Sequence, residues 1–253
     1  MNDVKSASRV LDLLELFSEV RGAMGVSDVS RRLAIPKSSA QGLLATLAAR
    51  GYLERRGSAY VLPEGLEDGR WVGGVRSRLI RLAQPAMDRM ARESGESVFL
   101  GVMTENLDIQ YVAKAISAAE LRYDASLEHR RAAYSTTIGL VCLAQMNEAA
   151  LAAYFARVRL RPLTERTVTN EQLLRKLLQR VRRQGYAELR DTNHMGVSGV
   201  SAPVFGPGGG VVAGLNLGAP TSRFARARDR LVAIARREAA DLSARLGRCR
   251  DAA

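Results

Sequence analysis

The stretch "IPKSSAQGLLATLAARGYLERRGSAYVL", residues 35–62, limits the possible folds most strongly, because it contains a helix with both ends marked. Pro36 suits the start of this helix, where its missing N–H would have no partner, and Gly51 suits its end. The apolar residues recur at helical spacing, at Ala40, Leu43, Leu44 and Leu47. The opposite face carries small or uncharged residues, namely Ser38, Gln41, Gly42, Ala45 and Ala49. A helix that only faces water usually carries more charge, so this second face needs an explanation.

The residues on either side predict two more helices and a ribbon of strands. Upstream, "SASRVLDLLELFSEV" has the periodicity of an amphipathic helix, and "GVSDVSRRLA" indicates a short second helix. In that second helix Ser27 is the expected N-cap, while Val29 and Leu33 face inward. Downstream, "YLERRGSAYVL" predicts two short strands around a turn at residues 56–58. Three short helices and a ribbon are the elements of a winged helix-turn-helix.

A helix that enters the major groove of DNA would explain the second face. Its N-terminal residues contact base edges, and small residues let its axis approach closely. Gln41 can make a bidentate contact to adenine. The predicted base-reading residues are Ser38, Ser39 and Gln41. The predicted phosphate contacts are Arg31, Arg32, Lys37, Arg55 and Arg56. The alternative is a three-helix interaction module whose third helix faces water.

Composition adds less to this argument. The formal net charge of +12 is weak evidence for DNA binding, because much of the basic surplus lies in the C-terminal third, where solvated helix faces explain it. No run of about 18 apolar residues predicts a membrane span. The N-terminus enters a charged helical pattern directly, which argues against a signal peptide. Cys142 and Cys249 lie too far apart in sequence to suggest a disulfide framework. We expect a soluble cytoplasmic protein without membrane contact.

The remaining residues predict a second domain. Alternation in "SVFLGVM" and "DIQYVAKA" indicates a hairpin, and "VSGVSAPVFGPGGGVVAGLNLG" indicates two strands joined by a glycine-rich turn. "STTIGLVCLAQM", "TNEQLLRKLLQRVRRQG" and "RARDRLVAIARREAADLSARLG" predict helices, the second of them capped by Thr169. The result is a mixed sheet flanked by helices, of a size that holds a small ligand.

Enzyme signatures are incomplete. "GPGGG" lacks the Lys-Ser/Thr ending of a phosphate loop and precedes a strand rather than a helix. "GVSGV" ends in Val200 where a nucleophile elbow needs glycine. His129 and His194 have no partner at ligand spacing. We therefore predict no catalytic residues, no metal and no cofactor.

"SDVSRRLAIPKSSAQGLLATLAARGYLERRGSAYVL" resembles the DNA-binding domain of the IclR family of bacterial transcription regulators. The resemblance continues in the family's order through "ESVFLGVM", "IQYVAKA", "LRYDASLEHRRAAYSTTIGLVCLAQM", "VRRQGYAE" and "MGVSGVSAPVFGPGGGVVAGLNLGAPTSRF". It implies an α+β fold with a winged helix-turn-helix in residues 1–65, a linker helix in 66–80, and a GAF-like effector-binding domain with a central antiparallel sheet in 81–253. It also implies a homodimer or tetramer and a small effector, often a carboxylic acid from catabolism.

The chain departs from the family pattern before the long helix of the effector domain. Glu128, Ala132, Thr137 and Leu140 stand where the family usually has glycine, proline, alanine and lysine, and Gly42 stands where arginine is common. The effector and the operator therefore do not follow from the family.

The resemblance also implies an effector pocket. The matching positions here are Tyr123, Arg131, Thr137, Leu189, Gly199, Asn216 and Gly218. The residues themselves add Tyr134, which begins a run of hydroxyls at a helix start, where backbone N–H groups favour an anion. Arg131 suits a carboxylate, and Asn216 needs a polar partner if it is buried in its apolar strand. Alternatively, the hydroxyls only cap the helix and Asn216 bonds to backbone.

We therefore expect a ligand-responsive DNA-binding transcription regulator of a catabolic operon, with a repressor favoured over an activator. Its expected effector is a small organic acid, with an aromatic acid favoured over an aliphatic one. Its expected DNA partner is a near-palindromic operator read by two copies, which pair through a linker helix that includes Trp71. The alternative is a small-molecule-binding enzyme with an accessory winged helix.

Overall fold

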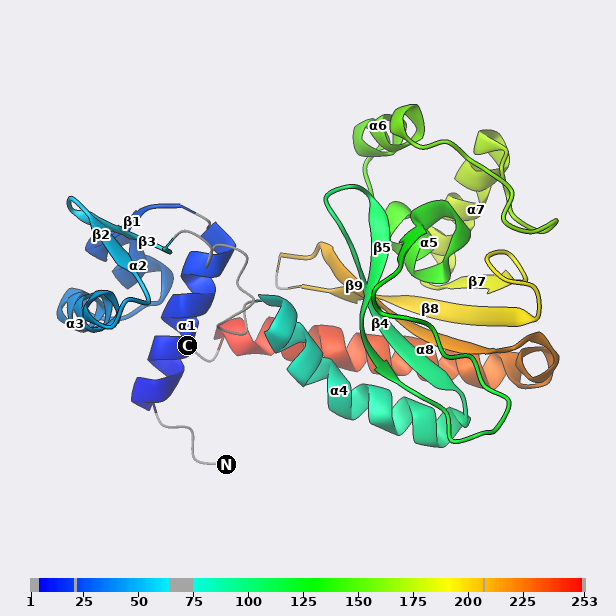
Figure 1. Ribbon diagram of the computed structural model, residues 1–253, viewed down its shortest axis with the longest axis horizontal. Helices are drawn as coiled ribbons and strands as arrows, with labels where there is room; N and C mark the ends of the chain where they lie inside the picture. The colour runs from blue at the N-terminus through cyan, green and yellow to red at the C-terminus, as the bar shows by residue number, and fades with distance from the viewer. Residues whose placement is uncertain (1–4, 21, 64–74, 207, 252–253) are drawn as a thin grey trace. The chain divides into compact units, whose positions relative to one another are not determined.

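The computed structural model describes residues 5–20, 22–63, 75–206 and 208–251 (Figure 1). The chain divides into two compact units, with the boundary between Arg81 and Leu82. The predicted boundaries at residues 65 and 80 stay predictions, because residues 64–74, including Trp71, lie outside the described residues. None of the helices in the described ranges combines the length and the apolar character that crossing a bilayer requires.

The first unit is a winged helix-turn-helix, as the sequence predicts. Its third strand runs between the other two, and both pairings are antiparallel. The expected two-stranded ribbon is thus a three-stranded sheet, because Met24 and Gly25 pair with Tyr60 and Ala59. The elements are α1 (Lys5–Val20), β1 (Met24–Gly25), α2 (Val26–Arg32), α3 (Lys37–Ala49), β2 (Glu54–Arg56) and β3 (Ala59–Val61).

The ends of α3 lie close to where the sequence places them. Pro36 is the N-cap, one residue before the helix, and Gly51 follows the C-cap residue with a φ of +77°. Ala40, Leu44 and Leu47 are buried, as their spacing predicts. The expected N-cap of α2 is wrong: Gly25 takes this position, because the strand pairing of β1 ends there and leaves Ser27 inside the first turn.

The second unit is a six-stranded sheet with helices on both faces (Figure 1). The strand order is β6-β5-β4-β9-β8-β7, and every pairing is antiparallel, so the expected mixed sheet is wrong while the antiparallel sheet implied by the resemblance is confirmed. The elements are α4 (Val75–Ser94), β4 (Ser97–Met103), β5 (Asp108–Ala115), β6 (Arg130–Ala132), the 3-10 helix η1 (Ala133–Ser135), α5 (Thr137–Leu143), α6 (Glu148–Arg157), α7 (Glu171–Gln184), β7 (Ala187–Arg190), β8 (Val197–Phe205), β9 (Val211–Pro220) and α8 (Thr221–Asp251).

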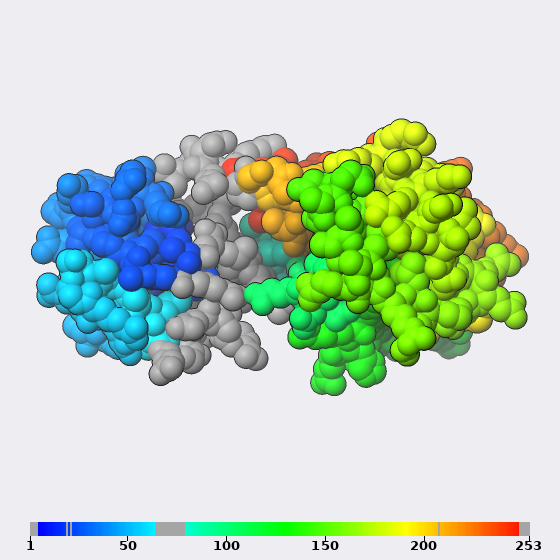
Figure 2. All heavy atoms as spheres, turned by 90° about the horizontal axis from the view of Figure 1, so that it is seen from above, coloured from blue at the N-terminus to red at the C-terminus, as the bar shows by residue number. Residues whose placement is uncertain are grey.

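The helices divide between the two faces of this sheet. Helices α4 and α8 run along one face, and α5 packs on the other (Figure 1). Residues from α6 through α7 form an outer layer on the α5 side, and their green and yellow-green atoms cover this unit in Figure 2. The N-cap of α7 is Asn170 rather than the expected Thr169, since its side chain accepts a hydrogen bond from the Leu173 amide at 3.0 Å.

Glycines let α5 approach the sheet closely. Gly101 on β4 and Gly214 on β9 are cross-strand neighbours, and a Cβ on either would lie within 3 Å of the Ile138 side chain, at 2.7 and 2.8 Å. A Cβ at Gly139 would lie only 2.0 Å from the carbonyl oxygen of Ala133. These close approaches bring Thr137, the first residue of α5, against the sheet face that carries Asn216.

Candidate DNA-binding surface and effector cavity

The outer face of α3 is open to solvent. Ser38, Gln41 and Gly42 are exposed, and Ser39 is half-buried. A Cβ at Gly42 would meet no atom of the described structure within 4 Å. Ser38 and Gln41 therefore share one accessible helix face, with Ser39 at its side, and α3 carries no charged side chain between Lys37 and Arg50. Such a face fits the close approach of a helix to base edges.

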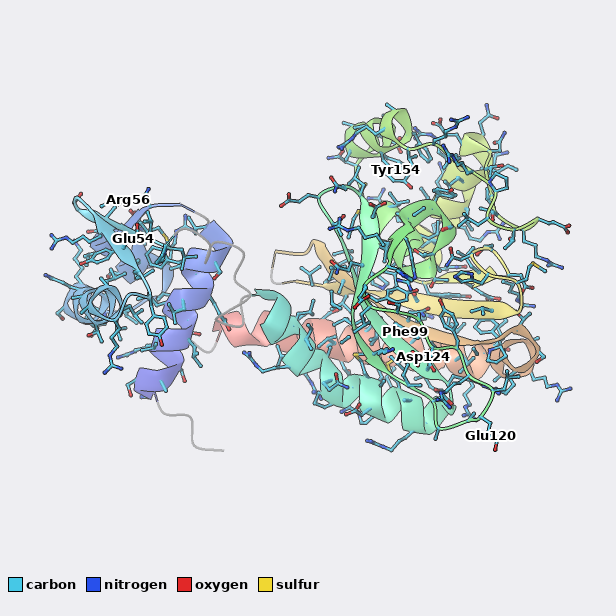
Figure 3. All side chains as sticks on the ribbon, viewed as in Figure 1. Glu54, Arg56, Phe99, Glu120, Asp124 and Tyr154 are labelled. Carbon is cyan, nitrogen blue, oxygen red and sulfur yellow. The ribbon has the colours of Figure 1, made fainter. Side chains whose placement is uncertain are left out.

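The predicted phosphate contacts lie on α2, at the start of α3 and on β2 of the same unit. Arg31, Arg32, Lys37, Arg55 and Arg56 are all exposed. Arg31 donates to Asp28 at 2.7 Å and Arg56 donates to Glu54 at 3.3 Å, the latter pair on β2 in Figure 3. Exposed ion pairs of this kind contribute little stability, so both guanidinium groups can exchange an acid partner for a phosphate at small cost.

A solvent-open cavity lies in the second unit, between the sheet and the start of α5. Six of the eight predicted ligand-binding residues line it: Tyr123, Thr137, Leu189, Gly199, Asn216 and Gly218. The lining residues outside the predicted set are Tyr111, Ser135, Thr136, Thr192, Asn193, His194, Val197 and Ser198. Hydroxyl and amide groups dominate this lining. Among the described lining residues, His194, which is exposed, is the one whose side chain is an imidazole.

Two glycines form the floor of the cavity. Gly199 on β8 pairs with Gly218 on β9, and Leu189 on β7 continues the same row. A Cβ at Gly218 would lie 2.9 Å from the Tyr123 ring, and a Cβ at Gly199 would lie 3.0 Å from the Asn216 amide. The absence of side chains at these two neighbouring positions hollows the sheet face.

A buried polar cluster lies beside this floor. Asn216 is 3% exposed, and its amide group is 2.9 Å from Thr137 Oγ1 and 3.1 Å from Ser201 Oγ. The amide nitrogen is the atom that faces these oxygens and the Val200 carbonyl, because an oxygen there would meet only acceptors. Ser201 Oγ also donates to Thr137 Oγ1 at 2.7 Å. Thr137 Oγ1 thus accepts a hydrogen bond from Ser201, and its own hydroxyl hydrogen can still be donated.

Two aromatic side chains, Tyr111 and Tyr123, also line the cavity. The rings of Phe99 and Tyr111 are stacked with centroids 5.1 Å apart, and Tyr123 meets Phe99 edge-on at 5.4 Å. Burial is the main cause that raises the pKa of Tyr111 and of Tyr123. Both hydroxyls therefore stay protonated at neutral pH and can donate to a ligand.

Arg131 and Tyr134 are not among the residues that line the cavity, so their predicted contact with a ligand stays a prediction. The Arg131 guanidinium lies 4.1 Å from the Tyr111 ring centroid and donates to the carbonyls of His129 and Ser126. The 3-10 turn η1 directs Tyr134 away, so that its hydroxyl donates to the Arg161 carbonyl at 2.9 Å. The side chains that line the cavity are therefore mostly uncharged, and Arg131 lies next to the lining residue Tyr111.

The hydroxyl of Thr136 has a capping role. It accepts a hydrogen bond from the Gly139 amide at 3.0 Å, as the alternative interpretation of the hydroxyl run expects.

The lining residues missed by sequence reasoning come mostly from residues 192–198. Their one signal in the sequence is a polar loop, "TNHMG", between two strands of the sheet.

Both units match family models. Residues 6–57 match the IclR helix-turn-helix domain, and residues 75–244 match the bacterial transcriptional regulator IclR C-terminal domain. Together these matches cover well over half of the chain. Both fall on the surface and the cavity described above.

Similar proteins of known role are transcription regulators, not enzymes. The HTH-type transcriptional regulator KdgR of Escherichia coli is 31% identical over 97% of this chain and 94% of its own length. The Pca regulon regulatory protein of Pseudomonas putida is 29% identical over 87% of this chain and 76% of its own length. The crystal structure of an IclR homolog from Microbacterium hydrocarbonoxydans, complexed with 4-hydroxybenzoate, superposes with a TM-score of 0.64 at 26% identity and covers 95% of this chain and 98% of that one. This chain belongs to the IclR family of bacterial transcription regulators.

Proposed function

We propose that this chain is a ligand-responsive repressor of a catabolic operon, whose first unit binds operator DNA and whose second unit binds a small organic acid. The observation that carries the proposal is the cavity walled by tyrosines, hydroxyls and the Asn216 amide in a chain of this family. A repressor is favoured, because release from DNA by a ligand requires no contact with the transcription machinery.

The lining of the cavity supports an aromatic acid over an aliphatic one. Tyr111 and Tyr123, both next to Phe99, offer ring surfaces against which an aromatic ring can pack. Thr137 and the tyrosine hydroxyls would donate hydrogen bonds to the acid group, and neutral donors are sufficient for a carboxylate. The homolog solved with 4-hydroxybenzoate gives the class of compound to test first.

On the DNA side, the proposed roles follow the exposed residues of the first unit. Ser38, Ser39 and Gln41 would contact base edges. Arg31, Arg32, Lys37, Arg55 and Arg56 would contact phosphates. Two copies, as a homodimer or within a tetramer, would read a near-palindromic site in the cytoplasm, with half-sites about one helical turn or a multiple apart.

Thermal denaturation of the full-length protein with a panel of aromatic and aliphatic carboxylates tests the effector site. A compound present at ten times its Kd should add about 1.4 kcal/mol to the free energy of unfolding. Thr137→Val and Asn216→Leu should remove this gain, because they delete the polar groups that face the ligand. Thr104→Val, in the turn between β4 and β5, is the matched control and should keep it. Stabilisation only by neutral or cationic compounds, or unchanged binding in both cavity variants, would contradict the assignment.

A further inference from the structure

The loop of residues 191–197 joins the cavity to helix α8. Thr192, Asn193 and His194 line the cavity. The same loop bonds to Thr221, the first residue of α8, whose amide donates to the Gly196 carbonyl at 2.8 Å and whose hydroxyl donates to Asp191 Oδ1 at 2.6 Å. Two hydrogen bonds therefore connect the loop that lines the cavity to the first residue of α8.

Asp191 closes this loop on itself as well. Its Oδ1 atom accepts a second hydrogen bond from the Gly196 amide at 2.8 Å, and its own amide donates to the Val197 carbonyl at 2.9 Å. Asp191 is 8% exposed. Its φ of +57° lies in the left-handed region, which costs free energy for residues other than glycine. It does not line the cavity. Its carboxylate instead fixes the loop and ties it to Thr221.

The other side of the loop is anchored by the segment between α6 and α7. The Thr164 hydroxyl donates to the Asp191 carbonyl at 2.6 Å, and the Thr167 hydroxyl donates to the Thr192 carbonyl at 2.7 Å. These bonds hold the backbone of the loop where its side chains reach the cavity. The hydrogen bonds to Thr221 therefore connect the loop to α8, which lies on the opposite face of the sheet.

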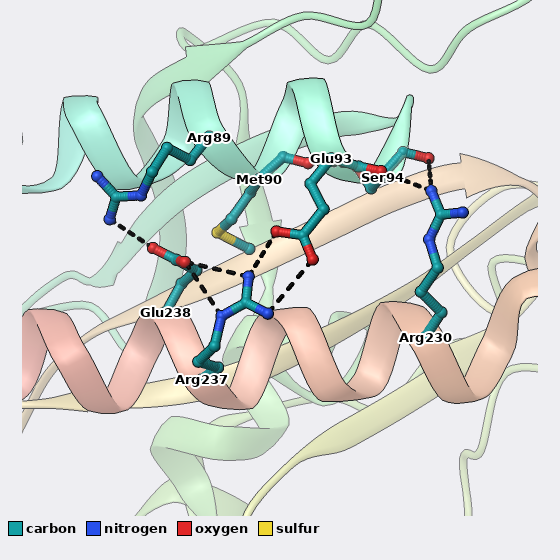
Figure 4. Close-up of polar contacts among 7 residues, drawn as sticks. All are labelled: Arg89, Met90, Glu93, Ser94, Arg230, Arg237 and Glu238. Carbon is teal, nitrogen blue, oxygen red and sulfur yellow. Dashed lines mark hydrogen bonds and ion pairs between the residues drawn. The ribbon is translucent and has the colours of Figure 1, made fainter.

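Helix α8 is in turn joined to α4 by ion pairs along its length (Figure 4). Arg89 on α4 donates to Glu238 at 2.6 Å, and Glu238 is 4% exposed. Arg237 pairs with Glu93 and Glu238, and Arg230 donates to the Glu93 carbonyl at 2.6 Å. The chain passes from the first unit to the second within α4. A shift of α8 would therefore displace its ion-pair partners on α4, the helix that follows the winged helix-turn-helix in sequence.

We propose that Asp191 is a positioning residue that makes residues 191–197 and the start of α8 one cooperative unit. A ligand in the cavity would then change the positions of α8 and α4 through this unit. Only the last step, the response to an effector, rests on the proposed function. Structural units of this kind open and close together, and amide hydrogen exchange measures their opening.

Hydrogen exchange of the free full-length protein, read by NMR, tests the proposal without any ligand. Thr221→Val removes the hydroxyl that bonds to Asp191 and to Ser198 but keeps the shape of the side chain and the amide. We expect the amides of Asp191, Gly196 and Thr221 to exchange faster together, by roughly tenfold. Thr221→Ser keeps the hydroxyl and should leave all three near the wild-type rates. Asp191→Gly removes the carboxylate without strain at a positive φ and should accelerate the same amides.

The proposal is overturned if Thr221→Val accelerates the loop amides while the Thr221 position keeps its rate, or if no amide responds. It is also overturned if the serine and valine variants behave alike, because the hydroxyl then plays no part. These outcomes are independent of the carboxylate panel: the panel alone decides the effector site, and the exchange rates alone decide the coupling.

Discussion

Replacing Gly139 by alanine is expected to destabilise the second unit by about 4 kcal/mol or more, at the upper end of single substitutions. The added Cβ would lie 2.0 Å from the Ala133 carbonyl oxygen and 2.4 Å from its Cα. Both atoms belong to backbone, so no side-chain rotation relieves the overlap. Either α5 or η1 has to move, and these two elements carry Thr137 and Ser135 to the cavity.

Urea denaturation followed by circular dichroism measures this effect. Gly247→Ala is the control, because this glycine is also helical but a Cβ there would meet no atom of the described structure within 4 Å. That variant should gain about 0.5–1 kcal/mol from the higher helix propensity of alanine. If Gly139→Ala and wild type unfold at the same urea concentration, α5 does not pack against η1 as described.

Replacing Gln41 by alanine should cost about 1–3 kcal/mol of binding free energy on the operator and little on random DNA. Gln41 is exposed on the outer face of α3, and its amide can donate to and accept from one adenine. Random duplexes are bound mainly through phosphates, which do not need this amide. The loss should therefore appear as lost specificity.

Lys37→Ala provides the contrast. Removing one phosphate contact should weaken binding to both DNAs and reduce the slope of log K against log salt by about one. Fluorescence anisotropy at several salt concentrations measures both variants, with the exposed Gln179→Ala of the second unit as a control. Equal losses for Gln41→Ala on operator and random duplexes would remove this residue from base recognition.

Local signals in the sequence were sufficient for α3. The ends of α3 are set by Pro36 and Gly51, and its buried face by the spacing of Ala40, Leu44 and Leu47, all within residues 36–51. The N-cap of α2 depends on a strand pairing between residues 24–25 and 59–60, which no local pattern shows. This is why the short strand β1 and the cap at Gly25 were not predicted.

The cavity was predictable only in part. Gly199 and Gly218 came from the family resemblance, and the structure adds that they are direct cross-strand neighbours. Tyr134 is close in sequence to cavity residues, but its hydroxyl bonds to the Arg161 carbonyl instead. The Arg131 guanidinium does not line the cavity but lies over the ring of Tyr111, which does. The loop of residues 192–197 reaches the cavity because Thr164, Thr167 and Thr221 hold it there, and such distant contacts leave no spacing to detect.

A small acid bound in the second unit is expected to change the affinity of the first unit for DNA. The direct test uses full-length protein and an operator duplex selected by it from a random pool. The operator Kd is measured while the carboxylate that most stabilises the protein is titrated in, and the acid itself is assayed for turnover. We predict a Kd at least about tenfold higher at saturation, a coupling of about 1.4 kcal/mol, with random DNA unaffected and the acid unconsumed. An operator Kd that stays constant at saturating acid, or an acid that is converted, would contradict the account.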